Sequence, residues 1–142
     1  MESPDEFVLD GSVTMAWYFE DEMNDYANAV RACMDQFRAV VPTLWPLEVE
    51  NTIVIGEWRK RSTPAQAATW LAFLAALPIV IDGETSVRAW TDTLSLARTH
   101  NLSAYDASYL ELAMRRGLPI ASLDGRLNAA ARAVGVPLYL AS

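Results

Sequence analysis

The chain has 142 residues, of which 52% are hydrophobic, and this is enough for one compact domain and excludes a disordered linker protein. Its net charge of −7 argues against general binding to nucleic acid, because phosphate binding usually leaves a basic surface. Metal-bridged binding of a short nucleic-acid segment stays open, since bound divalent cations add positive charge where a phosphate would sit. We expect a single domain over residues 1–142.

The composition also predicts a soluble, cytoplasmic protein. Cys33 is the only cysteine, so no intramolecular disulfide can form, and its spacing to apolar neighbours predicts a core position. Residues 1–6 lack the basic and apolar regions of a secretory signal. Charged residues from Asp82 onward interrupt the apolar segment that ends at Ile81, so we expect no membrane span.

Short apolar runs alternate with longer helical patterns along the chain. The pattern predicts, in order, a strand at 7–10, helices at 12–19 and 21–38, a strand at 39–41, helices at 44–60 and 63–77, a strand at 79–81, helices at 85–100 and 103–116, a strand at 119–122, a helix at 125–134 and a strand at 137–140. This alternation predicts a parallel sheet covered by helices on both faces. Ligands bind such sheets at the carboxyl ends of the strands.

Two aspartates fall at that edge. Asp10 follows the apolar run 7–9, and Asp124 follows the run 120–123. The structural alternative for each is an N-cap, because an aspartate just before a helix accepts hydrogen bonds from the free N–H groups of its first turn. The sequence leaves both roles open.

Two further acids fall on helix faces that should be buried or face a cleft. Asp106 shares its face with Tyr109, while the alternative is a capping box that begins at Ser103. Glu48 lies in line with Asn51 on the inward side of its helix, whereas Glu50 belongs to a solvated stripe. The alternative for Glu48 is a partly exposed acid at the rim of the helix.

If these four acids converge, their charges need compensation. Like charges about 4 Å apart repel by roughly 4 kcal/mol per pair at an effective dielectric constant near 20. Protons or a divalent cation can neutralise them, and carboxylates without histidine or cysteine suit Mg²⁺ or Mn²⁺. A carboxylate pocket holding such ions is suited to phosphodiester hydrolysis.

Four segments that carry these acids resemble, in order, the four motifs of PIN-domain ribonucleases, and in size the chain is similar to VapC toxins of type II toxin–antitoxin pairs. The segments are FVLDGSV at 7–13, PLEVEN at 46–51, LSAYDA at 102–107 and ASLDGRL at 121–127. The departures are small: Gly11 stands where alanine is common, and Ser122 stands where threonine is common.

The resemblance implies a three-layer α/β/α fold with a central, mainly parallel sheet and a Mg²⁺- or Mn²⁺-dependent endoribonuclease that leaves 5′-phosphate ends. Its matching positions make Asp10, Glu48, Asp106 and Asp124 the catalytic and metal-binding acids, with Ser12 as a supporting polar residue. It further implies an RNA substrate, a VapB-like antitoxin as partner, and a homodimer.

Two other functions would use some of the same residues. An aspartyl-phosphate phosphatase needs a second aspartate two residues after Asp10, where this chain has Ser12. A non-catalytic module whose acidic pocket holds a basic partner segment is the stronger alternative. The lone His100 excludes paired-histidine catalysis, and we expect it at the surface near a helix end.

The tryptophans and the basic clusters each have two interpretations. We expect core packing for the five tryptophans, with Trp17 and Trp58 as candidates for base stacking or partner contact. The clusters 59–61 and 115–116 are candidates for phosphate contact or for favourable charge at helix ends. A Glu57–Arg61 pair is expected four residues apart on one helix.

Overall fold

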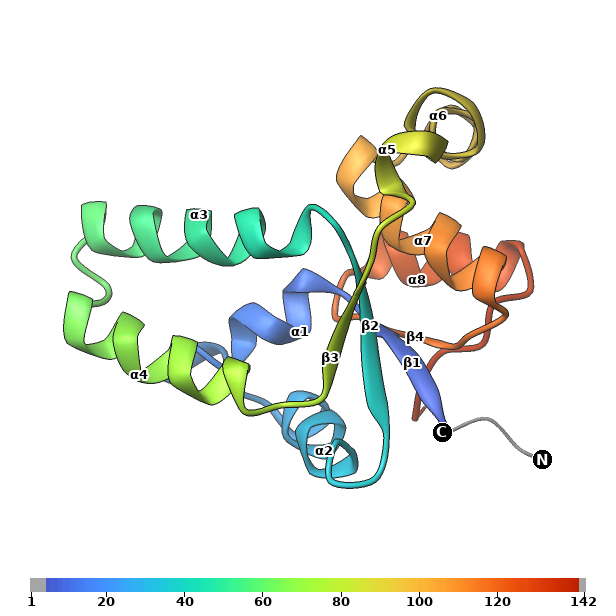
Figure 1. Cartoon of the computed structure of the whole chain (residues 1–142). Helices are drawn as coiled ribbons and strands as arrows, with labels where there is room; N and C mark the ends of the chain where they lie inside the picture. Colours follow the sequence, from blue (N-terminus) through green and yellow to red (C-terminus); the bar gives the residue numbers. More distant parts are fainter. Residues whose placement is uncertain (1–4, 141–142) are drawn as a thin grey trace.

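Four parallel strands form the centre of the molecule in this computed structural model, which describes residues 5–140 (Figure 1). The strands are β1 (Glu6–Leu9), β2 (Arg38–Pro42), β3 (Ile79–Asp82) and β4 (Ile120–Ala121), and their order in the sheet is β3-β2-β1-β4. Phe7 pairs with Ala39, and Val8 pairs with Ile120. The parallel sheet between two helical layers confirms the predicted three-layer α/β/α class.

The helices largely follow the predicted pattern. They are α1 (Gly11–Ala16), the 3₁₀ turn η1 (Glu20–Glu22), α2 (Asp25–Cys33), α3 (Trp45–Trp58), α4 (Pro64–Ala75), α5 (Thr85–Arg88), the π-helical turn η2 (Ala89–Thr93), α6 (Leu94–His100), α7 (Ala104–Arg116) and α8 (Gly125–Ala133). Within residues 5–140, no helix is long and apolar enough to cross a membrane.

Two predicted elements were wrong. The helix expected at 21–38 is divided, because Asn24 begins α2 with a side-chain bond to the backbone N–H of Ala27 and the chain turns after Cys33 before β2. The strand expected at 137–140 is a single parallel bridge between Ile120 and Leu138. Leu140 adopts a left-handed backbone conformation, with φ of 57°, so the chain is no longer extended at that residue.

The core lies around β1 and α7. Phe7, Val8 and Leu9 of β1 are fully buried, as expected for a central parallel strand covered on both faces. Residues 107–113 of α7 are buried, and this helix packs against β1 and β2. Because Asp106 immediately precedes this buried stretch, the packing of α7 holds it near the carboxyl end of β1.

Helices α3 and α4 form a hairpin that extends away from the sheet (Figure 1). The turn between them ends in the predicted capping box: Gln66 N donates to Thr63 Oγ1 (3.2 Å), and Thr63 N donates to Gln66 Oε1 (2.9 Å). Thr63→Ala should therefore lower the free energy of unfolding by about 1 kcal/mol. Urea unfolding of the two proteins at equal pH measures this, and Thr69→Ala, further along α4, is the control, for which a smaller loss is expected.

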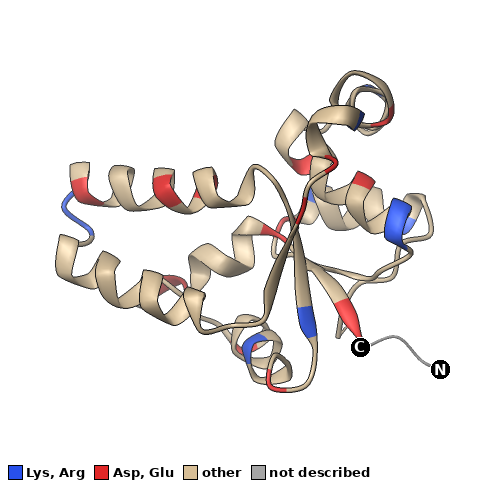
Figure 2. Ribbon diagram, viewed as in Figure 1, with Lys and Arg blue, Asp and Glu red and all other residues tan. Residues whose placement is uncertain are grey.

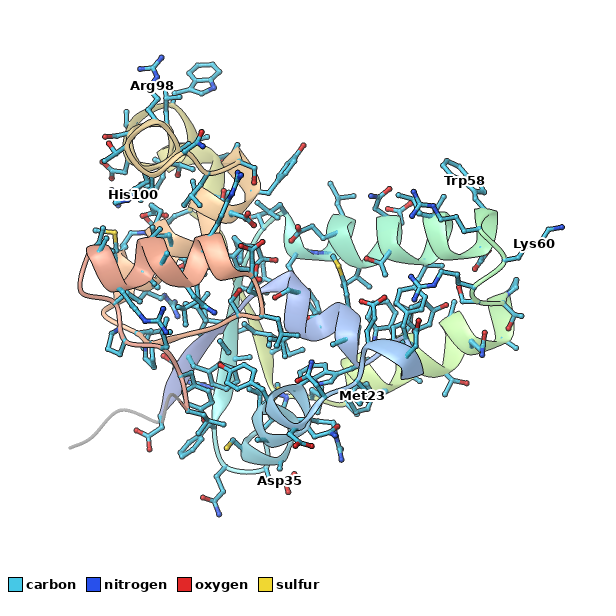
Figure 3. All side chains as sticks on the ribbon, turned by 180° about the vertical axis from the view of Figure 1, so that it is seen from behind. Met23, Asp35, Trp58, Lys60, Arg98 and His100 are labelled. Atoms are coloured by element: carbon cyan, nitrogen blue, oxygen red, sulfur yellow. The ribbon has the colours of Figure 1, made fainter. Side chains whose placement is uncertain are left out.

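The tryptophan predictions hold only in part. Trp17, Trp45 and Trp70 are buried, whereas Trp58 is 77% exposed and Trp90 is 90% exposed. Figure 3 shows Trp58 and Lys60 pointing outward at the far end of the α3–α4 hairpin. The core position expected for these two tryptophans was wrong, and Cys33 is only half-buried.

Candidate functional site

Asp10 lies directly after β1, and its side chain is buried, with 4% of its surface exposed. Asp10 N donates to Ala121 O of β4 (3.0 Å), which fixes the backbone at the sheet edge. The Oδ2 atom accepts hydrogen bonds from Ser12 Oγ (2.6 Å) and Ser122 Oγ (2.8 Å) and a longer one from Ser12 N (3.3 Å). Asp10 is also the N-cap of α1, so the capping alternative is correct and coexists with a buried site.

Burial raises the pKa of Asp10 above its ordinary value. The hydrogen bonds from the two serines oppose this rise, and the negative charge of Asp124 adds to it. Asp10 is therefore a carboxylate that the fold holds in place at an electrostatic cost.

Asp124 lies beside Asp10 on the neighbouring loop. Its N–H donates to Ser122 Oγ (2.9 Å), the same hydroxyl that donates to Asp10. Its Oδ1 accepts from Leu127 N (3.0 Å), so Asp124 is the N-cap of α8. Ser12 Oγ in turn accepts from Leu123 N (2.9 Å). The two serines thus join the loops after β1 and β4 around one carboxylate.

Glu48 approaches from the first turn of α3 and is half-buried. The buried hydroxyl of Tyr109 on α7 donates to Glu48 Oε1. Burial raises the pKa of Glu48 to about 7; the Tyr109 hydrogen bond opposes this rise, and the charges of Asp10 and Asp106 add to it. Glu48 is therefore shielded from solvent in part and has no positively charged partner among the described residues.

Asp106 is half-buried in the first turn of α7. Its backbone N–H donates to Ser103 Oγ (3.1 Å), so the predicted serine cap is present. Burial raises the pKa of Asp106 to about 6, and the charges of Asp10 and Asp124 contribute to the rise. The serine cap is therefore present, and the role of Asp106 as a site acid stays a prediction.

The four acids therefore influence one another from four different elements. Figure 2 shows acidic positions after β1, after β3 and on α3 and α7, together with others spread over the rest of the ribbon. Among residues 5–140, however, no group of three or more histidine, cysteine, aspartate or glutamate side chains is arranged so that it could hold a metal ion. The four-acid metal-ligand set stays a prediction.

The chemistry of the donors nevertheless fits a hard divalent cation. Hydrogen bonds from the described residues engage only Oδ2 of Asp10, Oε1 of Glu48 and Oδ1 of Asp124. Each of these side chains keeps a second oxygen without a protein donor. Oxygen donors of this kind, several of them charged, are those that Mg²⁺ and Mn²⁺ prefer.

A cavity of about 610 Å³ opens beside Glu48. Asn51 and Glu50 also line it, and both side chains are exposed. Asn51 was expected beside Glu48 on an inward or cleft-facing side of the helix, and it takes the cleft-facing position. Met15 of α1 and Tyr105 of α7 add apolar surface to its lining. A larger cavity, of about 1040 Å³, lies between α1, α2 and α4 and contains none of the four acids.

Two residues of this site were missing from the predicted set. Ser122 stands two residues before Asp124, as Ser12 stands two residues after Asp10. This matching spacing is the feature of the sequence that could have indicated Ser122 as a site residue. Tyr109 shares a helix face with Asp106, but nothing local in the sequence indicates that it reaches Glu48, 61 positions away.

Arg61 of the first basic cluster and both arginines of the second form ion pairs. Arg61 contacts Asp21 (3.0 Å) and Glu22 (2.9 Å), so the expected pair with Glu57 was wrong. Arg115 and Arg116 both contact the buried Asp82 at the end of β3. His100 ends α6, as expected (Figure 3).

Residues 7–133 match the family model of the PIN domain, and the chain therefore belongs to the PIN domain family. This confirms the family resemblance of the four acidic segments. No curated protein matches the chain.

Several solved structures share the fold. PAE2754 from Pyrobaculum aerophilum is 18% identical over 89% of this chain and 84% of its own, with a TM-score of 0.61. VapC20 from Mycobacterium tuberculosis, a sarcin–ricin loop cleaving toxin, is 14% identical over 87% of this chain and 94% of its own, with a TM-score of 0.59. VapBC2 from Rickettsia felis, bound to a DNA fragment from its promoter, is 12% identical over 94% of this chain and 96% of the matched chain, with a TM-score of 0.65.

Proposed function

We propose that this PIN domain, as a single domain over residues 1–142, is a Mg²⁺- or Mn²⁺-dependent endoribonuclease. The observation that carries the proposal is the buried Asp10 at the end of β1, surrounded by three further acids whose charges disfavour one another. A ligand that neutralises these negative charges would stabilise the folded protein. Membership of the PIN domain family supports a nuclease in particular.

In this mechanism, Asp10, Glu48, Asp106 and Asp124 would hold the cation through their oxygens. A bound cation lowers the pKa of a water ligand and stabilises the charge that develops on the phosphate. Ser12 and Ser122 keep the Asp10 carboxylate in one orientation by donating to its Oδ2. The cavity beside Glu48, with the exposed Tyr105 on its rim, offers room for a nucleotide next to the acids.

We further propose that the chain is the toxin of a type II pair, that its partner is a VapB-like antitoxin, and that it forms a homodimer in the cytoplasm. The similarity in fold to VapC20 and to VapBC2 supports the toxin and antitoxin assignments. An acidic site would attract a basic side chain from such an inhibitor by charge complementarity.

The test is cleavage of RNA by the purified full chain in Mn²⁺ and in EDTA. We expect cleavage and increased thermal stability in Mn²⁺, loss of both in EDTA, and products with 5′-phosphate and 3′-hydroxyl ends. Products with 2′,3′-cyclic phosphate ends, or cleavage that persists in EDTA, would contradict the proposal.

A second candidate is a non-catalytic module whose acidic pocket holds a basic segment. Two observations favour it: Asp10 and Asp124 are helix caps, and no preformed three-ligand group exists among residues 5–140. Such a module should gain neither RNA cleavage nor stability from Mn²⁺, so the same experiment separates the two candidates.

A further inference from the structure

Tyr109 and Glu48 form a contact between α7 and α3 inside the candidate site. Tyr109 is completely buried, and its hydroxyl donates to Glu48 Oε1. This is the only hydrogen bond that the described residues offer to the Glu48 side chain. The orientation of this carboxylate thus depends on one donor from a helix 61 positions further along the chain.

Gly11 shows how closely this contact approaches Asp10. A Cβ at Gly11 would lie 3.2 Å from Glu48 Oε1 and 3.5 Å from Tyr109 Oη. Gly11 does not have a positive φ, so its backbone conformation does not require glycine. Gly11 has no side chain, and this leaves room for Glu48 to approach closely. Glu48 therefore lies against the residue that follows Asp10.

We infer that Tyr109 is a positioning residue, whose hydroxyl holds Glu48 Oε1 over Gly11 so that Glu48 Oε2 is left for the divalent cation. The inference rests on the proposed metal-dependent nuclease. A group that orients a metal ligand in this way typically changes metal affinity by 10–100-fold. The competing explanation is purely structural, because a buried tyrosine hydroxyl needs an acceptor wherever it lies.

Mn²⁺ binding to the full chain, measured by calorimetry without RNA, separates these explanations. Tyr109→Phe keeps the buried ring and removes only the donor, and it should weaken Mn²⁺ binding by about tenfold or more. RNA cleavage by this variant should fall at low Mn²⁺ and recover at high Mn²⁺, with KM for RNA unchanged. The matched control is Tyr18→Phe, which removes a hydroxyl beside the larger cavity that contains none of the four acids. This control should bind Mn²⁺ like the parent.

A double-mutant cycle with Glu48→Gln tests whether Tyr109 acts through Glu48. Once Glu48→Gln is present, the further change Tyr109→Phe should leave Mn²⁺ affinity within about twofold. Parent-like Mn²⁺ affinity in Tyr109→Phe, or an undiminished effect in the double variant, would overturn the inference while leaving the nuclease proposal intact. A parent protein that neither binds Mn²⁺ nor cleaves RNA would overturn both.

Discussion

Asp10→Asn should lower the rate of RNA cleavage on the order of 10³-fold and should also stabilise the metal-free protein. Asparagine has the size of aspartate, and its Oδ1 can accept the hydrogen bonds from Ser12 and Ser122. The variant loses only the negative charge. Single-turnover cleavage of labelled RNA in Mn²⁺ measures the loss of activity.

The gain in stability follows from the raised pKa of Asp10, which burial causes first and the charge of Asp124 increases. An acid with a raised pKa in the folded state binds its proton more tightly when folded, so it costs stability as the pH rises above its unfolded value of 3.8. The gain from Asp10→Asn should therefore be absent near that pH and grow as the pH rises toward 7.5.

Asp35→Asn is the matched control, because Asp35 is an exposed aspartate in the turn before β2, remote from the acids (Figure 3). It should change neither the cleavage rate nor the pH dependence of stability. If Asp10→Asn cuts RNA as well as the parent, then Asp10 has no part in catalysis. If Asp10→Asn destabilises the metal-free protein at pH 7.5, then hydrogen bonds within the folded protein stabilise the negative charge of Asp10.

The parts of this site that could be predicted from sequence are those that depend on local patterns. Asp10 and Asp124 follow apolar runs and precede helices. A window of about ten residues around each therefore indicates a strand, its end at the edge of the sheet, and a helix cap. Asp106 follows the same logic, since Ser103 marks the start of its helix. The order of the elements along the chain then brings these helix starts to one edge of a parallel sheet.

The rest depends on contacts between distant residues, which leave no local pattern. Tyr109 looks like any apolar position of a buried helix until the structure shows Glu48 opposite its hydroxyl. Trp58 and Trp90 were assigned to the core because of their size, yet the α3–α4 hairpin and η2 carry them beyond the sheet. The last predicted strand failed because β4 has only two residues to pair with.

The ion pairs around Asp82 were not predicted, because they too join residues that are distant in the sequence. The cluster 115–116 was expected either to contact phosphate or to provide favourable charge at the end of α7. Arg115 instead contacts Asp82 (2.8 Å) and Glu111 (2.8 Å), and the Asp82 side chain is 5% exposed. Hydrogen bonds from Arg115 lower the pKa of Asp82, with the charges of Arg115 and Arg116 adding to this.

Arg115→Ala should lower the free energy of unfolding by about 3 kcal/mol at pH 7.5, because it leaves two buried carboxylates without their main partner. Arg116, whose Nε lies 3.1 Å from Asp82, limits the loss. Arg88→Ala is the control: Arg88 contacts Glu84 and Asp92, of which Glu84 also contacts Arg115, but its side chain is 36% exposed, compared with 16% for Arg115. This control should lower the free energy of unfolding much less than Arg115→Ala does, because water screens its ion pairs.

The pH dependence of these two losses identifies their cause. Without Arg115, the folded-state pKa of Asp82 should rise, so the variant recovers stability as this acid takes up a proton at lower pH. The difference between parent and Arg115→Ala should therefore shrink from pH 7.5 toward pH 4, whereas a loss of apolar packing by the arginine stem would not depend on pH. Urea unfolding at both pH values measures this. Equal losses for Arg115→Ala and Arg88→Ala would mean that the buried network stabilises the connection of β3 to α7 no more than a surface ion pair does.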